Sequence, residues 1–300
     1  MSHRLCSIVL ALSWFVAGVA RAELRVVATT TELAAVAKAV AGAHADVSAL
    51  ALPTQDPHFV DARPHLALDL ARADLLIVVG LQLEVGWLPT LQTGSRNGAI
   101  QVGGKGYLDC SQLVDLLDVP GGKLDRSQGD IHPGGNPHYM NDPRRAAAVA
   151  AGIAKRMAAL DPRHAAGYEQ GAQRFQAQLQ AARKRWEQQL ATLRGSKVIA
   201  YHKTLPYLMD WVGAEVVEHL EPKPGIPPNP RHVAHALGVA RAQGVKLVIQ
   251  EAWYPSSTGR VFAERAGARL VVLPGGTDFN HGKNYFDYMG EVVKRLLGRS

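Results

Sequence analysis

The chain contains little of what a disulfide-linked or membrane-spanning protein needs. Its 300 residues include only 2 cysteines, and only Cys110 lies outside the apolar N-terminal segment. A disulfide scaffold is therefore excluded, and a cysteine-based metal site, which normally needs two or more thiolates, is not expected. No apolar run reaches the roughly 20 residues of a transmembrane helix. By contrast, 47% of the residues are apolar, which excludes a disordered chain and allows one large or two medium domains.

Motifs of nucleotide and hydrolase chemistry are also missing. The sequence contains no G-x-x-x-x-G-K-[ST], no G-x-G-x-x-G after a strand, and no H-E-x-x-H, C-x-x-C or G-x-S-x-G. The densest basic cluster, Arg183-Lys184-Arg185, is flanked by Gln and Glu on a helical pattern, which is typical of a solvated helix face. We therefore expect no nucleic-acid partner and no zincin, thioredoxin or serine-hydrolase activity.

The N-terminus has the order of a secretory signal. Arg4 supplies a positive charge, Leu5–Val19 is an apolar run, and Ala20-Arg21-Ala22 is an A-x-A cleavage site. We expect residues 1–22 to be a signal peptide, so that the mature chain begins at Glu23 and works in the periplasm.

Two parts of the chain share one alternation of apolar strands and helices. Strands are expected at Leu24–Ala28, Val47–Leu52, Leu75–Val79 and Ala99–Val102, and after Gly195 at Val198–Tyr201, Glu215–Val217, Leu247–Gln250 and Leu270–Leu273. Helices are expected from a capping box at Thr29 and Glu32 to about Val40, at Pro64–Ala71, Leu83–Leu91, Leu205–Val212, Arg231–Gln243 and Gly259–Ala266, and at the C-terminus. This alternation predicts parallel sheets that are covered by helices on both faces.

One long helix is expected between these two parts. Segment 103–137 is glycine-rich and predicts a long loop, after which Asp142-Pro143 and Asp161-Pro162 have the N-cap and proline of helix starts. From the second start, apolar residues recur at steps of three and four, namely Ala172, Phe175, Leu179, Ala182, Trp186, Leu190 and Leu193. A helix of this length would measure roughly 50 Å. The predicted fold is α/β, with two four-stranded parallel-sheet lobes, residues 23–160 and 195–300, that are joined by a linking helix over residues 161–194.

Four residues that can bind metal lie at comparable places in this pattern. His58, His202 and Asp278 each lie at or just after the end of a predicted strand, and His138 precedes a predicted helix start. Ligands bind beyond the carboxyl ends of strands in open α/β sheets, and each lobe supplies two of the four residues, so one interlobe cleft can gather them. Three imidazoles and a carboxylate complete a tetrahedral zinc shell without an open position for an activated water. Such a site would hold a metal ion rather than catalyse a reaction.

Two further histidines remain alternatives. His132 lies in the glycine-rich loop, six residues before His138, and is either a solvated loop residue or an aid to metal capture. His281, three residues after Asp278, is the main rival for the fourth ligand position.

The segments around these candidates resemble a known family. The most specific are Asp56-Pro57-His58 with Arg63-Pro64, Asn136-Pro137-His138-Tyr139 with Asp142-Pro143, His202 at its strand tip, and Ile249-Gln250-Glu251-Ala252. Through them the mature chain resembles the periplasmic zinc- and manganese-binding proteins of ABC importers, the solute-binding family with a rigid helical linker. The resemblance implies metal ligation by His58, His138, His202 and Asp278, with Glu251 near the cleft but outside the ligand set.

The resemblance also implies the metal and the partners. Manganese-preferring relatives typically have glutamate in place of the third histidine, whereas this chain has His202, and nitrogen ligands favour zinc over manganese. Many zinc-binding members have a long loop that is rich in His and Asp. In the corresponding stretch this chain keeps only Asp130 and His132, which suggests that a periplasmic donor protein supplies the metal. The expected protein is therefore a monomer without enzymatic activity that captures Zn²⁺ as its transported ligand and delivers it to an ABC permease in the inner membrane. Mn²⁺ is the less favoured ion.

Two functions of other classes stay open at this point. A secreted zinc-dependent hydrolase could use the same site, but it would need an open metal position and a general base, for which Glu251 is the only obvious candidate. A metal-independent adhesin or scaffold would make the positions of the histidines coincidental.

Overall fold

The computed structural model describes residues 23–121, 129 and 131–299. The expected signal peptide and Asp130 lie outside the described residues. The described part of the chain contains two four-stranded sheets, with strand orders β2-β1-β3-β4 and β6-β5-β7-β8, and every strand pairing within them is parallel. The strands are β1 (Leu24–Ala28), β2 (Ala45–Ala49), β3 (Leu75–Val78), β4 (Tyr107–Asp109), β5 (Lys197–Ala200), β6 (Glu215–His219), β7 (Leu247–Glu251) and β8 (Arg269–Leu273). The predicted fold of two α/β lobes is confirmed.

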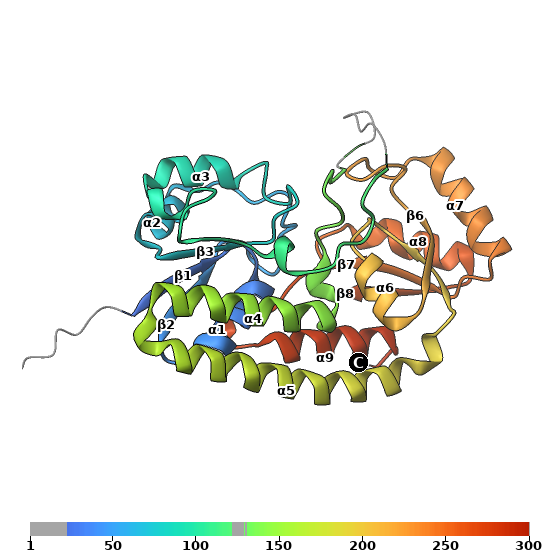
Figure 1. Cartoon of the computed structure of the whole chain (residues 1–300). Helices are drawn as coiled ribbons and strands as arrows, with labels where there is room; N and C mark the ends of the chain where they lie inside the picture. Colours follow the sequence, from blue (N-terminus) through green and yellow to red (C-terminus); the bar gives the residue numbers. More distant parts are fainter. Residues whose placement is uncertain (1–22, 122–128, 130, 300) are drawn as a thin grey trace, which may run out of the picture.

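Helices connect the strands in both lobes (Figure 1). The first lobe contains α1 (Thr31–Ala41), α2 (Pro64–Arg72), α3 (Leu88–Ser95) and α4 (Pro143–Leu160), and the second contains α6 (Pro206–Val212), α7 (Pro230–Ala242), α8 (Ser256–Ala266) and α9 (Tyr285–Leu296). The predicted N-cap Asp142 is confirmed, because its side chain accepts from Arg144 N. The predicted N-cap Asp161 precedes only the 3-10 turn Pro162–His164, and its side chain makes no cap hydrogen bond there. Within the described residues, no helix is both long enough and apolar enough to span a bilayer.

The predicted linking helix is confirmed as α5 (Ala165–Gln189), which runs beneath both lobes alongside α4 and α9 (Figure 1). Short 3-10 turns, Pro162–His164 and Leu190–Leu193, precede and follow it. The predicted apolar stripe is buried from Ala172 to Leu190. It belongs to one apolar cluster that includes side chains of both lobes, so the long helix is part of a shared core.

Three further local predictions are wrong. The fourth strand of the first sheet is Tyr107–Asp109, which pairs with β3, whereas residues 98–100 form a 3-10 turn. The expected capping box is absent: α1 starts after Thr30, and the Thr29 hydroxyl instead donates to the Glu84 carboxylate, 2.7 Å away.

The third wrong prediction is the helix at residues 83–91, since α3 begins only at Leu88. The residues before it form turns, because Gly80, Leu81 and Gln82 all have positive φ angles. The Glu84 carboxylate accepts hydrogen bonds from the backbone N–H groups of Val79 and Gly80 and holds this segment in its turn.

Candidate metal centre

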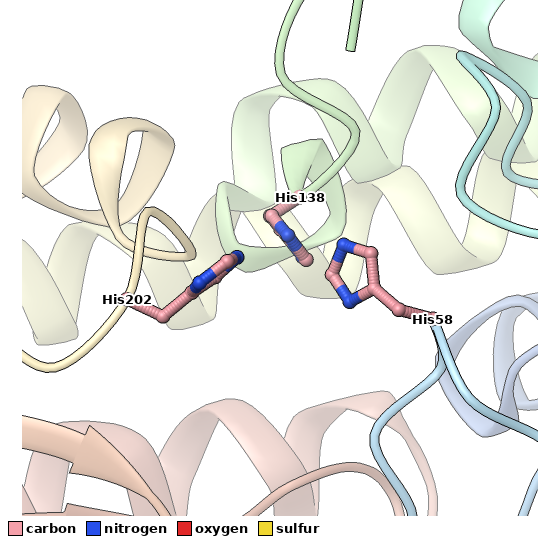
Figure 2. Close-up of side chains that lie close together, drawn as sticks. All are labelled: His58, His138 and His202. Atoms are coloured by element: carbon pink, nitrogen blue, oxygen red, sulfur yellow. The ribbon is translucent and has the colours of Figure 1, made fainter. Parts of the chain in front are cut away.

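Three of the four predicted ligands lie together between the two lobes (Figure 2). His58 is in the loop after β2, His138 directly precedes the 3-10 turn Tyr139–Asn141, and His202 follows β5. One ring nitrogen of each histidine lies within 4.8 Å of the corresponding nitrogens of the other two. Among the residues that the structure describes, this is the only group of three or more His, Cys, Asp or Glu side chains that meets this distance.

Two carboxylates fix the orientation of two of the rings. His58 Nδ1 lies 2.7 Å from Asp56 Oδ1, and His202 Nδ1 lies 2.6 Å from Glu221 Oε2. An ionised carboxylate only accepts hydrogen bonds, so each ring donates from Nδ1 and carries its lone pair on Nε2. Pairing of this kind sets the tautomer of metal-binding histidines and raises their basicity. Both Nε2 atoms are therefore prepared to bind a cation.

The charges of these pairs follow from their surroundings. Burial disfavours the charge of Asp56, but the hydrogen bonds and charge of His58 outweigh it and lower the pKa of Asp56. Burial likewise disfavours a charged His202, but Glu221 outweighs it and raises the pKa of His202. A proton and a metal ion therefore compete for the imidazole of His202.

His138 supplies the third ring of the group. Its Nε2 is buried and has no hydrogen-bond partner among the described residues. Burial, followed by the neighbouring imidazoles of His58 and His202, lowers the pKa of His138 well below its usual value. A buried polar atom without a partner is costly, and here it belongs to a neutral imidazole beside two oriented Nε2 atoms. A bound cation would satisfy all three.

Glu251 lies at the end of β7 and lines the same cavity as His138. The Thr204 hydroxyl donates to one oxygen of its carboxylate, whereas the other oxygen, Oε2, is buried without a partner among the described residues. Burial raises the pKa of Glu251 to about 7. The carboxylate can therefore take up or release a proton near neutral pH.

The structure does not bring Asp278 into the histidine group. Its side chain is 52% exposed and accepts a hydrogen bond from His281 Nδ1, 2.6 Å away. His132, by contrast, lies beside the group, with its Nε2 3.2 Å from Nε2 of His58. Its short distance from His138 in the sequence was the only signal of this placement, because the loop between them has no regular pattern.

The donor set determines which ions fit. Three imidazole nitrogens suit zinc, copper, iron and nickel, whereas magnesium, calcium and manganese favour oxygen donors. A structural zinc site is tetrahedral and takes four protein ligands. The three histidines therefore supply most of a zinc shell and leave its fourth position to another group.

A family model described as "Zinc-uptake complex component A periplasmic" (ZnuA) matches residues 26–298. Among curated proteins, the manganese ABC transporter substrate-binding lipoprotein PsaA of Streptococcus mitis is 28% identical over 156 residues, 51% of this chain and 47% of the relative. The iron ABC transporter substrate-binding lipoprotein MtsA of Streptococcus pyogenes serotype M1 is 26% identical over 161 residues, 53% of this chain and 48% of the relative. These matches span about half the length of the curated relatives.

Solved structures share the fold over nearly the whole chain. A ZnuA crystal structure has a TM-score of 0.75 at 19% identity and covers 93% of this chain and 99% of its own. The protein FpvC from Pseudomonas aeruginosa, solved with Mn²⁺, has a TM-score of 0.76 at 22% identity, with coverages of 92% and 98%. A mutant of the laminin-binding adhesin Lmb from Streptococcus agalactiae has a TM-score of 0.74 at 21% identity, also with coverages of 92% and 98%.

Proposed function

Since the chain belongs to the ZnuA family of periplasmic zinc-uptake components, we propose that it binds Zn²⁺ outside the cytoplasm and delivers it to the permease of an ABC importer. The observation that carries this proposal is the convergence of His58, His138 and His202 between the lobes. Two of these rings are oriented by carboxylates, and the third has a buried nitrogen without a partner among the described residues. Oriented, desolvated imidazoles of this kind bind a metal ion with little reorganisation.

Zinc is the proposed cargo because of the donor atoms. Relatives and structural neighbours have names that mention zinc, manganese or iron, so the family alone does not select the ion. In this chain the third position of the site is His202, a nitrogen donor, and nitrogen donors favour zinc over manganese. We therefore rank Mn²⁺ below Zn²⁺.

The location and partners are part of the same proposal. The signal peptide expected at residues 1–22 would place the mature chain in the periplasm, where it would meet the permease in the inner membrane. The chain lacks the long His- and Asp-rich loop of many zinc-binding members and keeps only Asp130 and His132 in that stretch, and we propose that a periplasmic donor protein passes the metal to the site. The protein would do this as a monomer.

The two alternatives receive different support. The family and the curated relatives named above are transport components, and nothing in them supports a secreted hydrolase. An adhesin with the same fold exists, but the converging histidines favour metal binding for this chain.

Metal analysis of the purified protein tests the proposal. Protein exported with its own signal segment, purified without chelator or affinity tag, should contain close to one zinc per chain by elemental analysis. His138→Ala should lose that zinc, because the variant removes a ligand, whereas His65→Ala on the exposed face of α2 should retain it. Wild-type protein that contains manganese would refute the choice of ion. Wild-type protein that neither contains nor binds a transition metal would refute the function.

A further inference from the structure

We propose that His132 is the fourth ligand of the metal centre, so that four imidazole nitrogens hold the ion. This inference rests on the function proposed above and names the group that completes its site. The observation that carries it is the contact between His132 Nε2 and His58 Nε2, which lie 3.2 Å apart.

The hydrogen bonds of the two rings determine which atoms face each other. His132 Nδ1 lies 2.8 Å from the carbonyl oxygen of Leu81, which can only accept, so Nδ1 is the donor. His58 Nδ1 donates to Asp56 in the same way. In the neutral rings, the lone pairs of both Nε2 atoms therefore point across the 3.2 Å contact. Two lone pairs repel each other at this distance unless a proton or a metal cation lies between them.

The distance also fits a shared zinc ion. Two nitrogens bound to a tetrahedral zinc at about 2.05 Å lie about 3.3 Å apart. The separation of 3.2 Å between His132 and His58 therefore equals one edge of a zinc tetrahedron within a tenth of an ångström or so. The nitrogens of His132 and His58 can therefore bind one ion where they lie. His132 is outside the group whose nitrogens all lie within 4.8 Å of one another, so its ring must shift toward His138 and His202 to complete the shell.

The local backbone holds His132 at this place. The Leu81 carbonyl that accepts from His132 belongs to a turn in which Leu81 and Gln82 have φ angles of 55° and 65°. Positive φ is uncommon for residues with side chains and persists where the surrounding structure enforces it. Gly134 lies against the same turn, since a Cβ atom there would lie 2.8 Å from the Leu81 side chain. Two loops are thus packed together so that one orients the imidazole of the other.

Asp278, the fourth ligand expected from the sequence, is less suited to this role. Its carboxylate is half exposed and accepts a hydrogen bond from His281, so it would have to leave this partner and move to reach the site. A fourth nitrogen in its place has a chemical consequence. An all-imidazole shell offers manganese no carboxylate oxygen and strengthens the preference for zinc.

A pair of matched variants tests the assignment. His132→Asn keeps an amide N–H that can donate to Leu81, close to the position of Nδ1, but removes the nitrogen at Nε2. Asp278→Asn is the control, because it removes the charge of the rival ligand and leaves His132 intact. Zinc affinity is measured by competition with a chromophoric chelator, and X-ray absorption at the zinc edge counts the bound imidazoles. Circular dichroism and thermal unfolding of the metal-free proteins check that each variant folds.

The expected results are specific to His132. Wild-type protein and Asp278→Asn should both bind zinc through four imidazoles with similar affinity. His132→Asn should bind through three imidazoles and an oxygen. Loss of a group that only orients a ligand weakens metal binding roughly 10- to 100-fold, so loss of a ligand itself should weaken it at least roughly 100-fold.

The remaining outcomes separate this inference from the proposed function. Three imidazoles in the wild-type shell, or unchanged affinity in His132→Asn, would overturn the assignment and leave the zinc-binding function intact. A loss confined to Asp278→Asn would make Asp278 the fourth ligand and would also overturn it. Wild-type protein without zinc affinity would refute the function itself and the inference with it.

Discussion

Replacement of Glu221 by glutamine tests whether the buried carboxylate prepares His202 for metal. Glu221 Oε2 accepts from His202 Nδ1 at 2.6 Å, and the two side chains are only 8% and 5% exposed. Glu221→Gln keeps the volume and a carbonyl acceptor, so the ring should keep its orientation and lose only the charge behind it. Removal of such a partner weakens metal binding roughly 10- to 100-fold, which corresponds to about 1.4 to 2.8 kcal/mol.

The pH dependence distinguishes this role from a purely structural one. Burial alone would lower the pKa of His202, but Glu221 outweighs burial and raises it. Glutamine should therefore lower the pKa of His202, so that fewer protons compete with zinc in acid. The loss of affinity caused by Glu221→Gln should be largest at about pH 8 and should shrink toward about pH 5.5, where the wild-type imidazole is already protonated.

The assay is competitive zinc titration of both proteins across this pH range. Glu218→Gln is a matched control, because Glu218 lies on β6, three residues before Glu221, and pairs with His235 outside the histidine group. It should bind zinc as the wild type does. Equal affinities of wild type and Glu221→Gln at every pH, or a difference that grows in acid, would refute the argument that Glu221 acts through His202.

Three other measurements follow from the structure. Zinc at a thousandfold excess over Kd should stabilise the fold by about 4 kcal/mol and raise the melting temperature by roughly 10 °C, which calorimetry of stripped and reloaded protein checks. Burial lowers the pKa of His219 to about 4, so between about pH 6.5 and 4 the unfolded chain binds a proton that the folded chain does not. The free energy of unfolding should therefore fall by about 3 kcal/mol as the pH drops through this range. His219→Asn should reduce this acid sensitivity in urea titrations, and an unchanged dependence of stability on pH would contradict the argument. Asp142 is fully buried, caps α4 and pairs with Arg144 and Arg145, so Asp142→Ala should cost about 2 to 4 kcal/mol of unfolding free energy, whereas exposed Asp115→Ala should cost little.

Much of the fold follows from the sequence because its strong signals are local. The strand at residues 24–28 and the apolar stripe of the linking helix need only hydrophobic periodicity, and Asp142-Pro143 marks its own helix start. The strand Tyr107–Asp109 could not be predicted in this way. It has three residues at the edge of its sheet, and its pairing with β3 is set by tertiary contacts.

In the site, too, local sequence signals predict the position of some residues and not of others. His58 and His202 follow strands of different sheets. Ligands bind beyond the carboxyl ends of parallel strands, so the sequence pattern places each of them at the ligand-binding edge of its own lobe. The position of His132 depends on how a patternless loop packs against the turn at Leu81. Asp278 has a suitable place in the sequence, but its side chain is paired with His281 at the surface. Loop trajectories of this kind are determined by packing rather than by periodicity.

The apolar cluster that joins the lobes determines how the molecule unfolds. It contains buried residues from β1 of the first lobe, from the linking helix and from α9 at the C-terminal end, such as Val26, Phe175 and Met289. Neither lobe can open fully without exposing part of this shared interior to water. We therefore expect the two lobes to unfold together in one cooperative transition, and movements that admit or release an ion to be confined to the loops above the core.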